Sequence, residues 1–146
     1  MADELPLIGF HFSLELQGKV AGYFTECSGM SSEHEVAEHK VVSATGQQKV
    51  MKIPGRLKWG DITFKKGITS AMDIWQWRKQ VEDGQVEAAR SNGSITMFDQ
   101  TLKPVAQWDF ERAWPTKVSG PTPKSDSNDI SVEELTITFE YIKRVK

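Results

Sequence analysis

Apolar and polar residues alternate with a period of two along much of the chain, and this pattern predicts antiparallel β-strands. The first predicted strand lies near the N-terminus, where the apolar positions are Phe10, Phe12, Leu14 and Leu16. Polar residues occupy the positions between them, as expected for a strand with one buried face. A turn at residues 17–19 leads into a second predicted strand over residues 20–26, and a third is predicted over residues 35–42.

Residues 43–55 interrupt this alternation. They contain two Gln, two Lys and the pair Pro54-Gly55, so we expect either a long mobile connection or a protruding hairpin. The apolar positions that follow are Leu57, Trp59 and Phe64. They predict a strand with a bulge or bend near Gly60, in which Ile62 is out of register.

One segment, at about residues 70–82, has the spacing of an amphipathic helix. Ser70 is the predicted N-cap, Asp73 follows three residues later, and the helix is expected to end before Gly84. Its apolar stripe consists of Ala71, Ile74, Trp75, Trp77 and Val81. This is the one helix that the sequence predicts.

The dipeptide Asn92-Gly93 predicts a two-residue hairpin turn, because both central positions of a type I′ turn favour positive φ. This turn would join strands over residues 86–90 and 95–98. A further hairpin would then bring back residues 105–112 as the next strand.

The last two predicted strands each have one apolar face. On the first of them the apolar residues are Ala106, Trp108 and Phe110, and on the second they are Leu135, Ile137, Phe139 and Tyr141. The first is expected to end at Trp114-Pro115, because proline lacks a ladder donor. Two such faces can pack together, since each fully buried large side chain contributes about 1.5–3 kcal/mol. The sequence therefore predicts a mainly β protein, an antiparallel β-sandwich or barrel with one α-helix.

The composition fits a single domain over residues 1–146, with 38% hydrophobic residues and a core supplied by five Trp and seven Phe. The net charge of −2 argues against nucleic-acid binding driven by phosphate neutralisation. The only cysteine, Cys27, cannot form an internal disulfide. No apolar run approaches the length of about 18 residues that a spanning helix needs, so we expect a soluble protein without membrane insertion.

Charge is distributed unevenly along the chain. Up to residue 40 the acidic residues are Asp3, Glu4, Glu15, Glu26, Glu33, Glu35 and Glu38. The next segment is basic, with Lys49, Lys52, Arg56, Lys58, Lys65 and Lys66. One interpretation is that these segments are solvated faces whose difference in charge has no function. The other is that they are complementary surfaces for head-to-tail contact between identical subunits.

Residues with catalytic or metal-binding chemistry do not form a recognisable site. His34 and His39 are five residues apart and would lie on opposite faces of a strand, so with Cys27 they make a poor zinc site. A calcium loop is weakly suggested by Asp126, Asn128 and Asp129. It lacks the glycine and glutamate that such a loop requires. Neither a nucleophile elbow nor a phosphate-binding loop occurs, so we expect no enzyme activity, no cofactor and no metal.

Several sequence blocks resemble, in the same order, those of contractile tail tube proteins. In the first half of the chain they are residues 24–30 (FTECSGM), 52–55 (KIPG), 61–69 (DITFKKGIT) and 75–78 (WQWR). In the second half they are residues 92–95 (NGSI), 108–110 (WDF), 113–117 (AWPTK), 120–121 (GP) and 126–128 (DSN). The resemblance extends over about residues 10–142 and includes the tubes of T4-type phage tails, R-type pyocins and extracellular contractile injection systems.

This resemblance implies a structural protomer of an inner tube, made in the bacterial cytoplasm and assembled into a phage tail or tail-like particle. Subunits of that family are small β-sandwiches that form hexameric rings with a β-lined lumen, stacked head to tail. The implied partners are further copies of the chain, the sheath protein, baseplate hub or spike and tube-initiator proteins, and DNA or effector protein as cargo. Whether the particle is a phage, a pyocin or an injection system stays open.

Two other functions also stay open at this point. A tube initiator or adaptor of the same family would form rings that do not propagate into filaments. A monomeric β-sandwich binding module would use Trp75, Trp77 or Trp114 to hold a small ligand.

Overall fold

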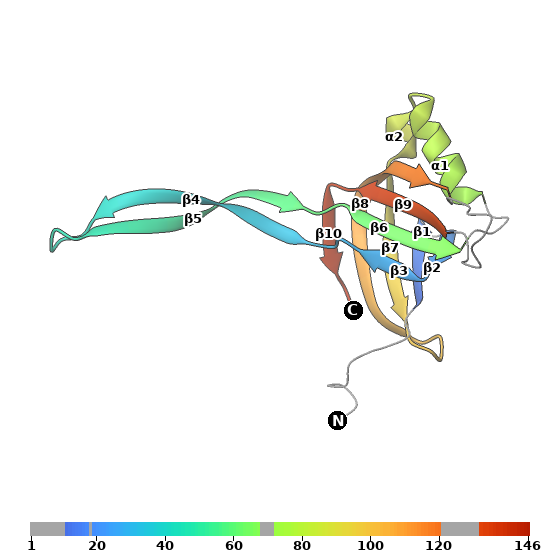
Figure 1. Cartoon of the computed structure of the whole chain (residues 1–146), viewed down its shortest axis with the longest axis horizontal. Coiled ribbons are helices and arrows are strands. Elements are labelled where there is room, and N and C mark those ends of the chain that lie inside the picture. Colours follow the sequence, from blue (N-terminus) through green and yellow to red (C-terminus); the bar gives the residue numbers. More distant parts are fainter. Residues whose placement is uncertain (1–10, 18, 68–71, 121–131) are drawn as a thin grey trace, which may run out of the picture.

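The computed structural model describes residues 11–17, 19–67, 72–120 and 132–146, and it consists of a β-sheet body and a long two-stranded arm (Figure 1). In chain order the first elements are β1 (His11–Leu16), β2 (Lys19–Phe24), β3 (Glu26–Ser28), β4 (Ser32–Val42), β5 (Gln48–Trp59) and β6 (Ile62–Gly67). They are followed by α1 (Asp73–Glu82), α2 (Val86–Ala89), β7 (Ser91–Phe98), β8 (Pro104–Ser119), β9 (Val132–Thr138) and β10 (Tyr141–Arg144).

The body is one antiparallel sheet that folds over on itself. Its strand order is β2-β1-β7-β8-β9-β6-β3, and β10 also pairs with β8. The long strand β8 belongs to both halves of the folded sheet. Its first part pairs with β7 up to Ala113, and its second part pairs with β9 from Trp114 onwards. Arg112, at the corner, has a positive φ of 54°. The predicted sandwich is therefore correct, and the barrel is not closed within one subunit.

The core lies between the two halves of the folded sheet. Its fully buried members include Leu14, Ile95 and Phe110 from one half and Phe64, Leu135 and Ile137 from the other. The apolar faces predicted for β1, β8 and β9 are thus confirmed for the described residues, whereas Phe10 lies outside them and Ser13, on the predicted polar face of β1, is also buried. Tyr141 is the exception, because the last strand breaks after Thr138 and Tyr141 begins β10 with its side chain exposed.

The predicted hairpin at Asn92-Gly93 is wrong. Both residues lie inside β7, where Gly93 pairs with Leu16 on one side and with Phe110 on the other. A Cβ at Gly93 would collide with the carbonyl oxygen of Glu15 and lie 2.7 Å from Cζ of Phe110. The glycine therefore permits close packing between strands, and residues 86–89 form the short helix α2 in place of a strand.

Two further predicted strands are each divided in the structure. The strand expected over residues 20–26 bends at Thr25, and its end joins β6 as β3. The strand expected around residues 57–64 is broken at Gly60, so β5 ends at Trp59 and β6 begins at Ile62. The predicted register was wrong as a result, since Ile62 and Phe64 share the buried face of β6 while Leu57 is exposed.

Strand β8 also runs through Trp114-Pro115, where the sequence predicted an end. Pro115 lies at an irregularity of the ladder between β8 and β9, at which the register shifts before Lys117. A bulge of this kind lets the strand continue past a residue that has no N–H to donate.

Helix α1 begins at Asp73, with Met72 at the N-cap position and no side-chain capping bond. The predicted N-cap Ser70 lies outside the described residues. The prediction of one helix is incomplete, because α2 follows after Gly84. Neither described helix is long and apolar enough to cross a membrane.

Candidate functional site

The arm formed by β4 and β5 is the most unusual feature of the subunit, and it extends well beyond the body (Figure 1). The two strands pair with each other from Ser32↔Trp59 to Val42↔Gln48, and with no other described strand. Strands of 11 and 12 residues span about 35 Å. Residues 43–55, expected as a connection or hairpin, form the tip of this arm and much of its second strand.

The surface of the arm is apolar to an unusual degree. Half of the exposed large apolar side chains among the described residues belong to it: Val36, Val42, Val50, Met51, Ile53 and Leu57. A two-stranded hairpin alone in water is marginally stable, and its free edges are open to pairing with other chains. Exposed apolar surface of this kind marks a site for protein–protein contact.

The acidic and basic segments of the sequence lie side by side in this arm. Glu33 is opposite Lys58 and Glu38 is opposite Lys52 in the ladder. Nζ of Lys58 lies 2.7 Å from Oε1 of Glu35, and the hydrogen bond and charge of Glu35 raise the pKa of Lys58. Part of the charge asymmetry is therefore explained by contacts within one subunit.

The root of the arm is the place where residues 29–31 and 59–61 connect it to the body. Two glycines there allow the two chain segments to approach closely. Gly29 has a φ of 90°, and a Cβ there would collide with the carbonyl oxygen of Asp61. A Cβ at Gly60 would collide with the hydroxyl of Ser31, and the Gly60 N–H donates a 3.1 Å hydrogen bond to the Ser31 carbonyl. The chain enters and leaves the arm through this close contact, which only glycine permits at both places.

Trp59, the last residue of β5, anchors the arm to the body. Its ring centroid lies 6.2 Å from that of Phe139 and 5.8 Å from that of Tyr141, the latter in an edge-on arrangement. Aromatic pairs of this geometry contribute about 0.5–1.5 kcal/mol beyond their buried area. The direction of the arm therefore depends on three aromatic side chains.

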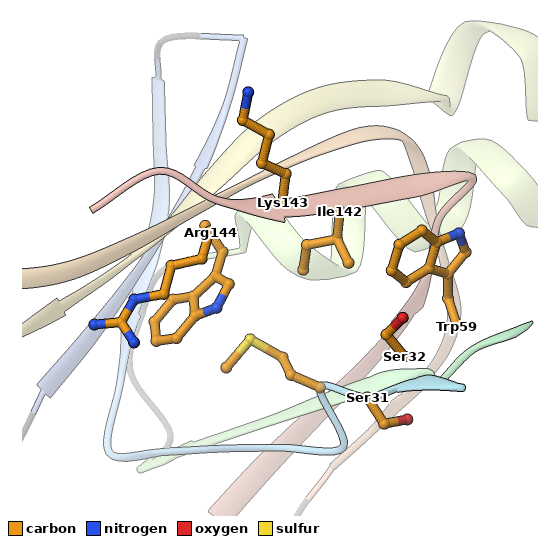
Figure 2. Close-up of a pocket in the computed structure, with 8 residues that line it drawn as sticks. Ser31, Ser32, Trp59, Ile142, Lys143 and Arg144 are labelled. Carbon is orange, nitrogen blue, oxygen red and sulfur yellow. The ribbon is translucent and has the colours of Figure 1, made fainter. Parts of the chain in front are cut away.

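A groove of about 210 Å³ lies beside this anchor (Figure 2). Its lining includes Met30, Ser31, Trp59, Trp108, Ile142 and Arg144. The guanidinium of Arg144 lies 5.6 Å from the ring centroid of Trp108, a cation–π contact. Lys143 also borders the groove, but its amino group points away from it (Figure 2).

The face of the sheet that points away from the core is polar. On β1, β7 and β8 its partly exposed residues are Glu15, Ser94, Gln107 and Asp109, whereas Ser13 and Thr96 on the same face are buried. The carboxylate of Asp109 accepts hydrogen bonds from Oγ of Ser94 at 2.8 Å and from Nε2 of Gln107 at 3.0 Å. In the described part of the chain this sheet half ends at β2 on one side and at β10 on the other, and each pairs with one neighbour only.

The sequence profile described as "T4-like virus tail tube protein gp19" matches residues 9–143, which is almost the whole chain. The chain belongs to this tail tube family. A search of curated protein sequences found no match. The family assignment agrees with the fold class and with the resemblance seen in the sequence.

Solved structures share this tail tube fold. A chain in the extended sheath–tube complex of the PVC extracellular contractile injection system aligns at 23% identity and a TM-score of 0.78, covering 98% of this chain and 93% of that one. A chain in the anti-feeding prophage tube-terminating cap aligns at 22% identity and 0.77, covering 97% and 91%. Hcp1 from Flavobacterium johnsoniae aligns at 16% identity and 0.55, covering 92% and 94%.

The tryptophans considered as a ligand platform have structural partners in this tail tube fold. Trp77 is buried, and its indole N–H donates a 2.7 Å hydrogen bond to the carbonyl of Ala89. Trp75 donates to Glu133, and Trp114 is half-buried in β8. The Trp75 bond joins α1 to β9 and the Trp77 bond joins α1 to α2, and neither contact favours a ligand-binding module.

The candidate metal ligands are placed as follows. His34 and His39 lie on the arm, whereas Cys27 lies in β3 of the body. Asp126, Asn128 and Asp129 lie outside the described residues. Within the described ranges no three His, Cys, Asp or Glu side chains gather closely enough to hold a metal ion. Burial raises the pKa of the Cys27 thiol to about 12, which makes it a poor nucleophile.

Sequence reasoning missed the arm root and its groove. The groove combines the segment before β4, the end of β5 and the strand β10, which are far apart in the chain. The one available signal was the pair Gly29 and Gly60, which bracket the arm at almost equal distance from its tip.

Proposed function

We propose that this tail tube protein is the protomer of an inner tube built from stacked hexameric rings, within a phage tail or tail-like contractile particle. Family membership supports the tube, and the exposed arm is the observation that supports stacking. A single subunit leaves this arm and the edge strands β2, β3 and β10 with free sides in the described residues, so it is suited to contact with further copies.

Ring closure would occur through the edges β2 and β10. Each has unpaired backbone groups along one side, and a neighbouring subunit can supply the missing ladder partner. Joining six sheets in this way would place their polar faces, with Ser94, Gln107 and Asp109, around a water-filled lumen. Such a wall conducts a DNA or protein passenger without a dedicated binding site, and it needs no catalysis.

Ring stacking would occur through the arm. Its apolar side chains, among them Val50, Met51 and Ile53, would be removed from water against the next ring. Burial of apolar area gives about 25 cal/mol per Å², and six subunits per ring contribute together. Lys49 and Lys52, close to the tip, add a charged contact.

The expected partners beyond the tube are a sheath, a baseplate and tube-initiator proteins. The similar structures come from a sheath–tube complex, a tube-terminating cap and the baseplate of the anti-feeding prophage. The outer surface of α1, which borders a cavity lined by Met72, Trp75 and Lys79, is available for such a partner.

Negative-stain microscopy of the purified protein, alone and with its baseplate partner, tests this proposal. We expect tubes of stacked six-fold rings. A variant in which residues 38–52 are replaced by Asn-Gly keeps the pair Ala37↔Ile53 and closes the arm with a short turn. It should give a folded subunit and at most single rings, since the arm makes no strand pairs with the body.

Charge reversal gives a finer test. Lys49→Glu with Lys52→Glu should shorten the tubes at physiological salt, whereas Lys103→Glu with Lys117→Glu changes the charge equally at exposed positions outside the arm and should not. Unchanged tube length in the arm variant would count against the charged contact. Rings of the unaltered protein that never extend would indicate a tube initiator, and monomers under all conditions would overturn the proposal.

A further inference from the structure

Leu102 is one of the two most exposed large apolar side chains among the described residues, with a relative exposure of 70%. It lies in the loop of residues 99–103, which joins β7 to β8 at the end of the sheet away from α1 and α2 (Figure 1). Its φ of 64° is in the left-handed region, which glycine, asparagine and aspartate adopt far more readily than leucine. The other described non-glycine residues with a positive φ, Gln17 and Arg112, are polar. A leucine displayed to water at a strained position points to a contact outside the subunit.

The carboxylate of Asp99 makes this loop rigid. Its Oδ1 accepts hydrogen bonds from the N–H of Thr101 at 2.8 Å, from Oγ1 of Thr101 at 2.7 Å and from the N–H of Lys103 at 3.0 Å. The main chain closes the same turn, since Asp99 N–H donates to the Lys103 carbonyl and Leu102 N–H donates to the Asp99 carbonyl, both at 3.0 Å. The backbone of Leu102 is thus fixed in advance, which lowers the entropy cost of docking its side chain.

The groove at the arm root has the size and chemistry to receive such a side chain (Figure 2). Its lining includes Trp59, Trp108 and Ile142, and Arg144 provides a cation at the rim. An apolar cavity of about 150 Å³ holds a benzene molecule, so a groove of about 210 Å³ suits one leucine side chain. Neither Arg144 nor Asp99 takes part in any of the ion pairs between described residues.

Leu102 does not reach the groove of its own subunit. The ladder between β7 and β8 extends to the pair Phe98↔Pro104, directly beside the loop. Trp108 lies four residues further along β8, which is about 13 Å along the strand. Because the loop is fixed to the end of this ladder, the leucine that fills the groove has to come from another copy of the chain.

We propose that Leu102 of one subunit docks in the arm-root groove of a second copy, with Asp99 facing Arg144 at the rim. The loop and the groove lie at different places on the subunit, so the contact is heterologous and each subunit can give Leu102 to one neighbour and receive it from another. A contact of this kind repeats from copy to copy, as a tube requires. The inference rests on the proposed function in requiring that copies associate, and it adds a contact to those of the arm and the sheet edges.

Disulfide trapping between two single-cysteine proteins tests this contact. One protein carries Lys103→Cys in the loop and the other carries Ser32→Cys at the groove, both in a Cys27→Ala background with Leu102 unchanged. After the two are mixed and assembled, mild oxidation should give a disulfide-linked dimer with one copy of each, identified by mass spectrometry. Either protein alone should give little dimer, because a heterologous contact does not bring two loops or two grooves together. With Glu82→Cys on α1 in place of Ser32→Cys, the bond should form roughly tenfold more slowly, because the effective concentration is lower.

Leu102→Asn, added to the Lys103→Cys protein, tests the leucine itself. Asparagine tolerates the positive φ, so the melting temperature of the unassembled subunit should stay the same or rise. Cross-linking to the groove should fall by about tenfold or more, since burial of a leucine side chain contributes at least that much to association. A lowered melting temperature would give Leu102 a role in its own subunit, and unchanged cross-linking would remove it from the contact. Either result overturns the proposal.

Microscopy of the same mixtures separates this inference from the proposed function. Tubes without a dimer that depends on Leu102 would overturn the docking and leave the tube proposal in place. Dimers that depend on Leu102 without tubes would support the docking and count against the tube. The absence of association in both assays would overturn both.

Discussion

The indole nitrogen of Trp75 donates a 2.9 Å hydrogen bond to Oε1 of Glu133 and so joins helix α1 to strand β9. Glu133 is buried, and its second carboxylate oxygen lies 3.9 Å from Nζ of Lys66, its ladder partner on β6. Lys66 is also buried, with its ammonium 5.5 Å from the ring centroid of Phe24. The buried carboxylate therefore depends on one hydrogen bond and one cation.

We expect Lys66→Met to lower the free energy of unfolding by about 3 kcal/mol, because it leaves a buried charge without its partner. Trp75→Phe should lower it by about 1–2 kcal/mol, since Glu133 then loses a hydrogen-bond donor in a buried position. Urea unfolding followed by circular dichroism measures both effects.

The double variant Lys66→Met with Glu133→Leu separates the ion pair from simple packing. Replacing both charges with apolar side chains removes the need for compensation, so most of the stability should return. A double variant as unstable as the sum of its single variants would show that the pair itself is not responsible.

Gly93→Ala should destabilise the subunit strongly, because the added methyl group meets the main chain of Glu15 as well as the ring of Phe110. We expect a loss of about 2 kcal/mol or more, as for other overpacked cores. Gly120→Ala is the matched control, since its Cβ would make ordinary contacts of 3.7 and 3.8 Å with Trp75. Thermal unfolding of the two variants should differ clearly, and similar midpoints would contradict this explanation.

Gly93 also shows which parts of the fold the sequence could predict. Strands β1, β8 and β9 have one face on the core, so their alternation identified the strands and most of their core side chains, although it missed the burial of Ser13 in β1. Asn92-Gly93 has the local pattern of a turn, but the approach of β1 and β8 on either side decides its role. No local pattern contains that information.

The arm was hard to predict for a different reason. Its strands have no core to face, so nothing selects an alternating pattern, and residues 48–55 were interpreted as part of a connection or hairpin. The groove brings together Met30, Trp59 and Ile142, whose sequence separations give no common signal. The tail tube assignment did not require the arm or the groove to be predicted as structures, because the ordered sequence blocks carried it.

The pH dependence of stability should report on Glu87. Hydrogen bonding to Arg112 lowers the pKa of this carboxyl below its ordinary value of 4.5, with further contributions from the charges of Arg112 and Arg90. A lowered pKa in the folded state adds stability above the unfolded-state value, and this stability is lost as the pH falls through the folded-state value. Glu87→Gln should therefore lower the melting temperature at pH 7.

The difference between Glu87→Gln and the unaltered protein should shrink as the pH falls below 4.5, the ordinary value for this carboxyl. Glu38→Gln, on the arm, controls for the loss of one negative charge. Melting curves from pH 7 to pH 3 provide the measurement. A difference that stays constant over this range would mean that the ion pairs of Glu87 do not contribute to stability.

Cys27 should react very slowly with alkylating reagents in the folded subunit. Its thiol is largely buried where β3 pairs with Phe64 of β6, and this burial raises its pKa from 9.0 to about 12. Because the thiolate is the reactive form, its fraction at pH 8 falls roughly a thousandfold. Iodoacetamide labelling followed by mass spectrometry should be slow in buffer and fast in urea. Equal rates in the two conditions would show that β3 opens readily from the edge of the sheet, and a variant that loosens β3, such as Phe64→Ala, should raise the rate in buffer.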